Sequence, residues 1–302
     1  MKKIAILIPV FNHIAFTKKC IQGLHDLISD STFENCEYHI VVIDDGSSDG
    51  TAEWLVEHHP EVHVLKGNGS LWWSGGINRG ADFSISELKV DFLLLWNNDI
   101  IPAGDYFIQL ADLLTIIDIQ TVAGSKILYY NQDRNDIIWS LGGFFNPKSG
   151  KKSMLGYNMP DSDEFSNPAD VDWLPGMGTL VPVSVVEKIG FWDEKVFPQY
   201  HGDSDFTFRA KTAGYRVISY PQLRIWNDKS SSGLTHGGTF HGLIKALTSR
   251  RANANFKDNF RFYRRHSTSI LAYKVLFGFY WNLIGGFFKW KFLSLFGIKK
   301  HF

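Results

Sequence analysis

Amide and acidic side chains follow an apolar run in the first third of the chain. The run Leu93–Trp96 has the length of a strand and ends in Asn97, Asn98 and Asp99. In open α/β sheets ligands bind outside the carboxyl ends of the strands, where these three side chains would lie. A single carboxylate flanked by oxygen donors suits Mg²⁺ or Mn²⁺, usually together with phosphate oxygens of a substrate. The same residues are also typical of a polar turn before Pro102, so this stretch alone leaves both interpretations open.

Two more carboxylates, Asp44 and Asp45, directly follow the apolar run Val41–Ile43. A turn with a helix cap explains the later part of Asp44–Thr51, but a turn does not require an acid directly after a buried strand. A carboxylate in that place can accept hydrogen bonds from a nucleobase or from ribose hydroxyls. The chain has no P-loop lysine motif and no G-x-G-x-x-G after its first strand, so the P-loop and dinucleotide-binding classes are not favoured.

A glycine-rich stretch with two adjacent tryptophans, Asn68–Gly80, is a third candidate. Glycines let the backbone approach a ligand closely, and Arg79 near a helix start can hold a phosphate. The structural alternative is a mobile loop with an aromatic anchor. Because two neighbouring tryptophans are costly to leave in water, we favour a binding loop.

Asp203 and Asp205 stand two residues apart, just before an amphipathic segment. One of them can cap the helix, and Arg209 can pair with Asp205 across one turn. Asp203 then has no structural task, and a carboxylate within reach of a hydroxyl nucleophile can act as a general base. The two residues alone do not decide between a cap and a base.

Apolar runs of strand length alternate with amphipathic segments along residues 3–230. This alternation predicts an α/β fold with a mostly parallel, doubly wound sheet flanked by helices. The expected strands are Lys3–Val10, Tyr38–Ile43, Val62–Lys66, Asp91–Trp96, Val122–Tyr130, Tyr215–Ser219 and Gln222–Trp226. The expected helices are Thr17–Leu27, Ala52–His58, one containing Asn78 and Arg79, Ala103–Ile117, Val183–Ile189 and one through Arg209 and Lys211. We expect a glycine-rich loop at Gly67–Gly76 and a surface excursion with short strands at 131–172.

The composition limits the class of protein. With 302 residues, 44% of them hydrophobic and 21% charged, the chain can form one large α/β domain or two smaller ones and is not disordered. Its two cysteines, Cys20 and Cys36, make neither a disulfide framework nor a metal-type spacing. The apolar part of Met1–Val10 is too short for a signal peptide, so we expect it to be the first strand of a cytosolic protein.

The last sixty or so residues are basic and aromatic. Residues 240–302 contain twelve Lys or Arg and one acid, a net charge of +11 that leaves −11 for residues 1–239. We expect a helix at His241–His266, and the longest uncharged run after it, Val275–Phe288, has fourteen residues. Because a membrane span needs about twenty apolar residues, we expect instead a segment lying on anionic lipid. The alternative is a helical hairpin packed on the preceding part of the chain or on a dimer partner. No nucleic-acid motif supports a third interpretation, binding of a nucleic acid.

Taken in order, these motifs resemble those of the family 2 glycosyltransferases, which have the GT-A fold, a Rossmann-like mostly parallel sheet flanked by helices. The resemblance covers about residues 3–230 and is carried by five segments in the expected order: Ile8–Asn12, Val42–Thr51, Gly67–Gly80, Asn97–Asp99 and Asp203–Tyr215. The forms NGSLWWSGGINRG and GDSDFTFRAKTAGY are most similar to the rhamnosyltransferase-like bacterial subgroup that builds surface polysaccharides.

The resemblance implies a catalytic domain at 1–239, with a nucleotide-binding half at about 1–130 and an acceptor half at 131–239, followed by the helical, basic and aromatic region 240–302. It implies an inverting, metal-dependent transfer from a UDP- or dTDP-linked sugar, with rhamnosyl, galactosyl and glucosyl groups as candidates. The acceptor would be a hydroxyl of a lipid-linked or growing surface polysaccharide at the inner face of the cell membrane. A homo-oligomer is compatible with this. The alternative function is a non-catalytic nucleotide-sugar or glycan-binding module.

The resemblance also assigns roles to individual residues. Asp203 would be the base, with Asp205 as the competitor, because Gly202 stands where the family's first acid is usual. Asp99 would bind Mn²⁺ or Mg²⁺; the family's late histidine is replaced by Trp226-Asn227-Asp228, so Asn227, Asp228 or, from further on, His236 would complete the site. The residues expected to bind the nucleotide sugar are Pro9, Phe11, Asn12, Asp44, Asp45, Ser47, Gly69, Asn78, Arg79, Asn97 and Asn98. Those expected to bind the acceptor, with core packing as the alternative, are Trp73, Trp173, Gly176 and Met177.

Overall fold

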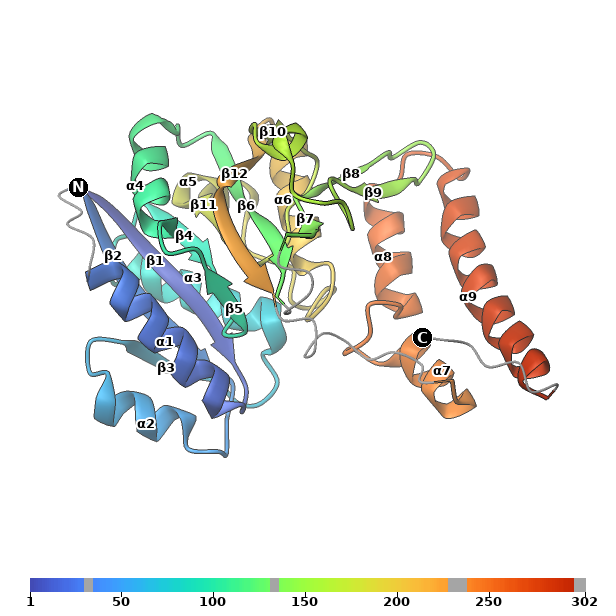
Figure 1. The fold of residues 1–302 in the computed structure, drawn as a ribbon, viewed down its shortest axis with the longest axis horizontal. Coiled ribbons are helices and arrows are strands. Elements are labelled where there is room, and N and C mark those ends of the chain that lie inside the picture. The colour runs from blue at the N-terminus through green and yellow to red at the C-terminus, as the bar shows by residue number, and fades with distance from the viewer. Residues whose placement is uncertain (30–34, 131–135, 228–237, 296–302) are drawn as a thin grey trace. The chain divides into compact units, whose positions relative to one another are not determined.

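The computed structural model describes residues 1–29, 35–130, 136–227 and 238–295 (Figure 1). The chain forms two compact units. The first comprises Met1–Phe144 and Met154–Ser231, and the second comprises Phe145–Ser153 and Ser232–Phe302.

The first unit is built on a mostly parallel sheet whose first half follows the sequence prediction. Strand β1 (Lys2–Val10) lies between β2 (Cys36–Asp44) and β4 (Phe92–Leu95), and β3 (His63–Lys66) lies beyond β2, all four parallel. β1 is buried on both faces, as its run of Ile, Leu and Val predicts. The carboxyl ends of these strands therefore meet at one edge of the sheet, which we call the carboxyl edge.

The second half of the sheet brings later segments to the same edge. Strand β11 (Thr179–Pro182) runs antiparallel between β4 and β6 (Thr121–Tyr129), and β12 (Arg216–Asn227) runs parallel to β6. β5 (Ile100–Pro102) pairs antiparallel with the end of β12. Since β6 and β12 point the same way as β4, Asn227 also lies at the carboxyl edge.

One strand prediction was wrong. The two strands expected at Tyr215–Ser219 and Gln222–Trp226 are one continuous strand, β12, whose register with β6 shifts between Tyr220 and Arg224. The shift contains Pro221, which has no N–H to donate to a sheet and is tolerated at a bulge. The sequence break therefore marks a bulge and not a turn.

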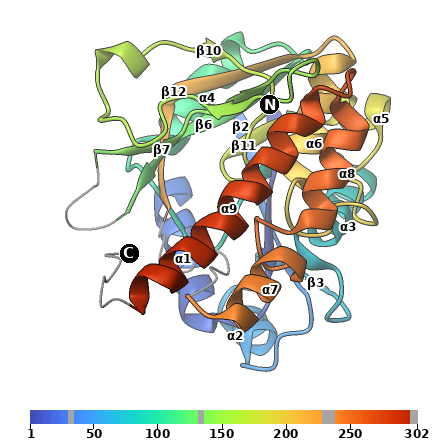
Figure 2. The same ribbon diagram turned by 90° about the vertical axis from the view of Figure 1, so that its right-hand side faces the viewer.

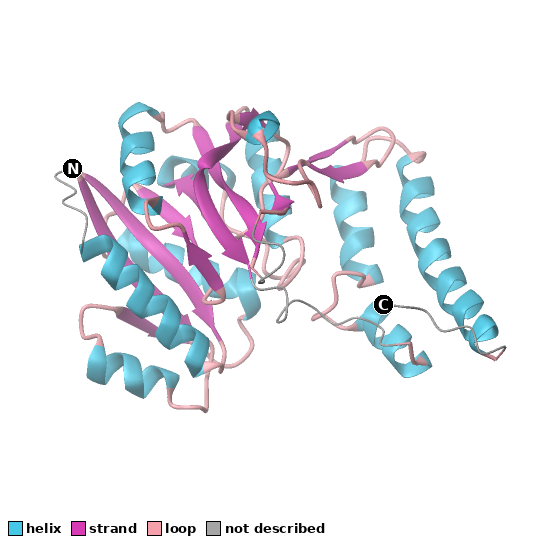
Figure 3. Ribbon diagram, in the orientation of Figure 1, coloured by secondary structure: helices cyan, strands magenta, loops and turns pink. Residues whose placement is uncertain are grey.

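Helices cover both faces of the sheet (Figure 3). On one face, α1 (Ile14–Ser29), α2 (Thr51–His58) and α4 (Tyr106–Ile116) bury residues such as Ile21, Leu55 and Phe107 against the even-numbered side chains of β1. On the other face, α3 (Trp72–Ser86), α5 (Val183–Ile189) and α6 (Gly202–Thr212) pack against its odd-numbered side chains. The doubly wound α/β architecture is thus confirmed.

The excursion after β6 contains only short elements, as predicted. They are β7 (Ile138–Ser140), β8 (Gly143–Phe145), β9 (Lys152–Met154), a 3₁₀ turn at Asp163–Phe165 and β10 (Ala169–Asp170). β7 pairs with β6, β8 pairs with β9, and β10 pairs with β12.

The glycine-rich loop is shorter than the sequence suggests. Helix α3 already begins at Trp72, so Gly75 and Gly76 are helical and not part of a loop. A Cβ at Gly76 would lie 3.0 Å from the Cβ of Pro9, so these glycines allow α3 to pack closely on β1. Their missing side chains contribute to helix–sheet packing, which the sequence alone could not distinguish from space for a ligand.

The second unit is helical. The single helix expected at His241–His266 is two helices, α7 (Phe240–Thr248) and α8 (Phe256–His266), followed by α9 (Ala272–Ser294). The side chain of Asn255 accepts a hydrogen bond from the N–H of Asp258, 3.1 Å away, and so caps α8 and separates it from α7. Within the described residues, no helix combines the length and the apolar character that a membrane crossing requires.

Candidate functional site

The loops after β1 and β2 are joined by side-chain hydrogen bonds. The N–H of Asn12 donates to Ser47 Oγ (2.7 Å), and Asn12 Oδ1 accepts from the N–H of Ser48 (2.9 Å). Asp44, 3% exposed, accepts from the N–H of Ser47 at 2.8 Å. Three of the residues expected to bind a nucleotide are therefore in one place, beside Pro9 and the 46% exposed Phe11.

Asp45 organises the loop that leads into α3. Its carboxylate accepts backbone N–H groups from Gly69 (2.8 Å), Leu71 (2.9 Å) and Trp72 (3.1 Å), and the side chain is only 8% exposed. A carboxylate at the start of a helix accepts from N–H groups that have no partner within the helix. Its negative charge is also attracted by the positive end of the helix dipole. Asp45 therefore holds Gly69 against the carboxyl edge, a role that no local sequence pattern indicates because the two residues are far apart in the chain.

Asn78 and Arg79 lie within α3 and behave differently. The amide of Asn78 exchanges two hydrogen bonds with the backbone of Trp192 (2.9 and 3.0 Å) and donates a third to Glu194 (2.8 Å). It fastens α3 to the segment before α6. Arg79 is exposed, and no ion pair of Arg79 occurs among the residues that the structure describes.

The side chains after β4 connect three parts of the first unit. Asn97 Oδ1 accepts from the indole Nε1 of Trp73 at 3.3 Å, and Asn98 donates to Thr17 Oγ1 at 3.0 Å. The carboxylate of Asp99 is close to Cys20 on α1. Burial first, and the charge of Asp99 in addition, raise the pKa of the Cys20 thiol to about 12, against a hydrogen bond with Trp96 that lowers it.

Asn227 is placed next to Asp99 by strand pairing. In the antiparallel pair of β12 and β5, Asn227 stands opposite Ile100, the residue after Asp99, and it is 5% exposed. Two of the residues expected to bind a metal thus come from adjacent strands at the carboxyl edge. Asp228 and His236, the other two, lie outside the described residues.

The oxygen donors at this edge fit a hard divalent cation. In the described part of the chain, no group of three or more His, Cys, Asp or Glu side chains is arranged to hold a metal ion. Asp99 with the amide oxygens of Asn97 and Asn227 would be a weak set of oxygen ligands. Such a set suits Mg²⁺ or Mn²⁺ completed by water and substrate phosphates, and does not suit the nitrogen and sulfur ligation of Zn²⁺.

Asp203 lies in the first turn of α6 beside the segment before β11. Its Oδ2 accepts from the N–H of Gly176 at 2.9 Å, and the side chain is half-buried. Burial first, and the Asp203 charge in addition, raise the pKa of Tyr200. Asp203 Oδ1 accepts from the N–H of Ser204 at 2.7 Å. A partly exposed carboxylate whose two oxygens are oriented by backbone N–H groups keeps free lone pairs and is suited to accept a proton from a hydroxyl.

Trp73 is packed between two glycines of this region. A Cβ at Gly176 would overlap the indole of Trp73, and a Cβ at Gly202 would overlap Ser74 Oγ and lie 3.4 Å from the indole. Gly202, the position where the resemblance leads one to expect an acid, therefore has no room for a side chain, because α3 and α6 meet there. This packing could not be found in the sequence, but it brings Asn97, Trp73, Gly176 and Asp203 together.

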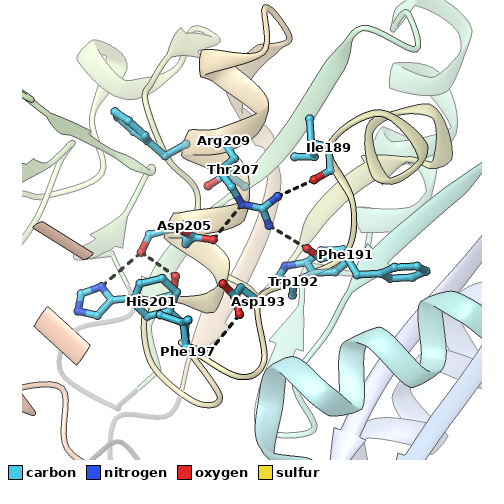
Figure 4. Close-up of polar contacts among 12 residues, drawn as sticks. Ile189, Phe191, Trp192, Asp193, Phe197, His201, Asp205, Thr207 and Arg209 are labelled. Carbon is cyan, nitrogen blue, oxygen red and sulfur yellow. Dashed lines mark hydrogen bonds and ion pairs between the residues drawn. The ribbon is translucent and has the colours of Figure 1, made fainter. Parts of the chain in front are cut away.

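Asp205 has a structural role. It is 0% exposed and pairs with Arg209 Nε at 3.0 Å, while the guanidinium also donates to the carbonyl oxygens of Ile189 and Phe191, each at 2.8 Å (Figure 4). The pair joins α6 to the segment after α5. A carboxylate buried in this way is not accessible to an acceptor, so the geometry favours Asp203 over Asp205 as the base.

The remaining acceptor candidates are less accessible than expected. Trp173 is 6% exposed and is held by backbone hydrogen bonds to Gly143 of 3.0 and 3.2 Å. Met177 is half-buried against the core cluster that contains Ile225. Both side chains contribute to packing, and Trp73 is the more exposed of the two tryptophans.

Comparison with known proteins identifies the family. The family model described as Glycosyl transferase family 2 matches residues 5–167. The chain is 25% identical over 246 residues to an undecaprenyl-phosphate mannosyltransferase of Micrococcus luteus, covering 78% of this chain and 88% of that protein. It is 25% identical over 177 residues to the low-salt glycan biosynthesis hexosyltransferase Agl10 of Haloferax volcanii, covering 59% of this chain and only 54% of that protein.

Two solved structures share the fold. The structure of GalNAc-T7 with UDP, GalNAc and Mn²⁺ aligns with a TM-score of 0.57 at 13% identity and covers 76% of this chain and 44% of that chain. The mannosyltransferase PcManGT of Pyrobaculum calidifontis, in complex with GDP-Man and Mn²⁺, aligns with a TM-score of 0.53 at 14% identity and covers 90% of this chain and 66% of that chain. At such identities the likeness concerns the GT-A-like fold.

Proposed function

Because this chain belongs to glycosyl transferase family 2, we propose that its carboxyl edge binds a nucleoside diphosphate sugar and transfers the sugar to a lipid-linked acceptor. The observation that carries the proposal is the meeting of Asp99, Asn227 and Asn97 with Trp73 and the half-buried Asp203 at one edge of the sheet. These residues come from separate segments of the chain, and packing alone does not require polar side chains from all of them.

The nucleoside would lie over the loops after β1 and β2. Asp44, Asn12 and Ser47 already form a hydrogen-bonded unit there, so they offer a preorganised polar surface. The exposed ring of Phe11 adds an apolar surface beside it. Asp45 contributes indirectly, because it holds Gly69 and the start of α3 in position.

Asp99, Asn97 and Asn227 would hold a divalent cation, Mn²⁺ or Mg²⁺. When bound, the cation neutralises charge on the diphosphate. Since the described residues supply a single carboxylate to that set, affinity for the cation should depend strongly on the nucleotide. Both solved structures named above contain Mn²⁺, which supports this part of the proposal.

Asp203 would orient the acceptor and accept its proton. The N–H of Gly176 keeps one carboxylate oxygen in place at 2.9 Å, and the other oxygen accepts from the N–H of Ser204. A direct attack by the acceptor on the anomeric carbon would invert the configuration there. The neighbouring Trp73 offers an aromatic surface near this carboxylate for a sugar ring or an acceptor head group.

The identities of the acceptor and of the transferred sugar are a further part of the proposal. The relative from Micrococcus luteus is named for undecaprenyl phosphate and mannose, which supports a polyprenyl-linked acceptor and a hexosyl donor. The resemblance to rhamnosyltransferases adds deoxyhexosyl donors to the candidates. The donor panel should therefore contain UDP-, dTDP- and GDP-linked sugars.

The test measures release of nucleoside diphosphate from each donor with Mn²⁺, with and without polyprenyl phosphate or a lipid-linked glycan. We expect release from one donor class that needs Mn²⁺ and increases with acceptor. A chain that binds a nucleotide tightly but turns over no donor would instead be the non-catalytic binding module. Retention of the anomeric configuration in the product would contradict the direct displacement.

A further inference from the structure

Helix α9 presents an apolar stripe to the solvent. The stripe comprises Phe277, Trp281, the half-buried Ile284, Phe288 and, at the C-cap just after the helix, Leu295, which recur every three, four or seven residues and so lie on one side. Phe277 is 51% exposed, Phe288 is 54% exposed, and Trp281 and Leu295 are each 80% exposed. Aromatic side chains of this size are costly to leave in water, so we expect a binding partner to cover the stripe.

The core of the second unit accounts for little of the stripe: the ring of Phe277 lies 6.4 Å from that of Phe256 on α8, while Trp281, Phe288 and Leu295 stay exposed. Another side of α9 already packs on that unit through Leu276, Tyr280 and Phe287, which are 2%, 5% and 5% exposed. The hydroxyl of Tyr280 donates to the carbonyl oxygen of Ala254 at 3.0 Å, and its ring lies 5.0 Å from that of Phe256. Figures 1 and 2 show α8 and α9 side by side, in agreement with these contacts.

The positive charge of α9 distinguishes between two possible partners of the stripe, a second copy of the helix and an anionic lipid surface. Three exposed lysines, Lys274, Lys289 and Lys291, lie on α9, and the helix contains no Asp or Glu. The single acid of residues 240–302 is Asp258, which is 4% exposed and stands 3.6 Å from Arg261. A second copy of α9 would therefore bring lysines against lysines, whereas an anionic lipid surface provides the opposite charge.

We propose that the apolar stripe of α9 lies in the surface of a bilayer that contains anionic phospholipid. With 23 residues, α9 is about 35 Å long and can lie along the boundary between headgroups and acyl chains. The lysines of α9 bind lipid phosphates while Trp281, Phe288 and Leu295 enter the acyl boundary. The surface goes beyond sugar transfer, because none of these residues belongs to the carboxyl edge.

The experiment measures sedimentation of the full-length protein with vesicles. One set of vesicles contains phosphatidylglycerol in phosphatidylcholine, and the other contains phosphatidylcholine alone. The stripe variant carries Trp281→Ser, Phe288→Ser and Leu295→Ser. The matched control carries Ile108→Ser, Ile116→Ser and Ile119→Ser, three apolar residues of the first unit that are 49%, 80% and 53% exposed.

We expect the wild-type protein and the control to bind the anionic vesicles equally. The stripe variant should bind about 100-fold more weakly, because three large apolar groups no longer leave water. Changing Lys274, Lys289 and Lys291 to Gln should weaken binding to anionic vesicles by about 100-fold and reduce its dependence on salt.

Unchanged vesicle binding by the stripe variant would overturn the proposal. So would a wild-type dimer that the stripe variant converts to a monomer while neither binds vesicles, because the occupant would then be a second copy. Hydrolysis of the donor in solution should be the same in the stripe variant and the wild type. The lipid proposal can therefore fail without affecting the proposed transferase function. Likewise, absence of donor turnover would leave the lipid proposal unaffected.

Discussion

Replacing Asp203 and Asp205 separately by Asn tests which acid is catalytic. Both substitutions preserve shape and remove one negative charge. The structure predicts opposite results, because Asp203 is half-buried with an oriented oxygen and Asp205 is 0% exposed in an ion pair. Asp205→Asn should destabilise the protein and leave the transfer reaction intact. Asp203→Asn should remove most of the transfer activity and destabilise the protein less.

The magnitude follows from the contacts of Arg209. Removing one partner of a buried pair costs about 3–5 kcal/mol. The Arg209 side chain is 23% exposed and keeps its bonds to the carbonyl oxygens of Ile189 and Phe191, so the lower value applies, about 3 kcal/mol. For a unit of this size, that loss lowers the unfolding temperature by roughly 6 to 12 °C.

Asp203→Asn should lower stability by about 1 kcal/mol, less than Asp205→Asn, since the amide oxygen of Asn can still accept from one of the two backbone N–H groups, of Gly176 and Ser204, that donate to the half-buried carboxylate. Loss of a general base should reduce the transfer rate by about 10²- to 10⁴-fold. Transfer is measured well below both unfolding temperatures, and unfolding is followed by circular dichroism. Near wild-type transfer by Asp203→Asn, or lost transfer with unchanged stability in Asp205→Asn, would refute the assignment.

Three further predictions concern residues at or near the carboxyl edge. Trp73→Phe removes the 3.3 Å hydrogen bond to Asn97 but keeps an aromatic ring, so transfer should fall about fivefold; an unchanged rate would mean that this bond does not position Asn97. Asn227→Ala should raise the Mn²⁺ concentration needed for half-maximal transfer about 10- to 100-fold, as measured by metal titration, and no change would exclude Asn227 as a ligand. Burial by itself would raise the pKa of the Asp49 carboxyl, but hydrogen bonds from Thr51 and from the N–H of Ile14 outweigh this effect. The pKa of Asp49 therefore lies below its ordinary value. Its stabilisation should be fully present above pH about 4 and be lost at lower pH, so the difference in unfolding temperature between wild type and Asp49→Asn should disappear in acid; a constant difference would contradict this.

The sequence predicted the fold of the first unit well, because its strands are strongly apolar and regularly spaced. The runs Lys3–Val10 and Asp91–Trp96 are each continuous enough to indicate a strand buried on both faces. The same runs end in acids and amides, so the pattern of residue types alone located the carboxyl edge and most of its polar residues. These features are local, and local patterns are what a single sequence records.

The roles of individual side chains depended on contacts between distant segments. Asp45 and Asn78 resemble ligand-binding residues in the sequence, but backbone groups of Gly69 and Trp192 use their hydrogen-bonding capacity. The ends of elements were also unpredictable, because Gly75 and Gly76 became helical once α3 packed against β1. No local pattern indicates which segment will fold against which.

The two acids at the start of α6 illustrate the same limit most clearly. Asp203 and Asp205 differ little in the sequence, where either could cap a helix or accept a proton. In the folded chain, the pair with Arg209 buries Asp205, and the glycine contacts around Trp73 leave Asp203 partly exposed beside Gly176. The sequence by itself determined that two acids stand at the start of α6, and the tertiary structure decided which of them reaches the solvent, because burial and solvent access are properties of the packed molecule.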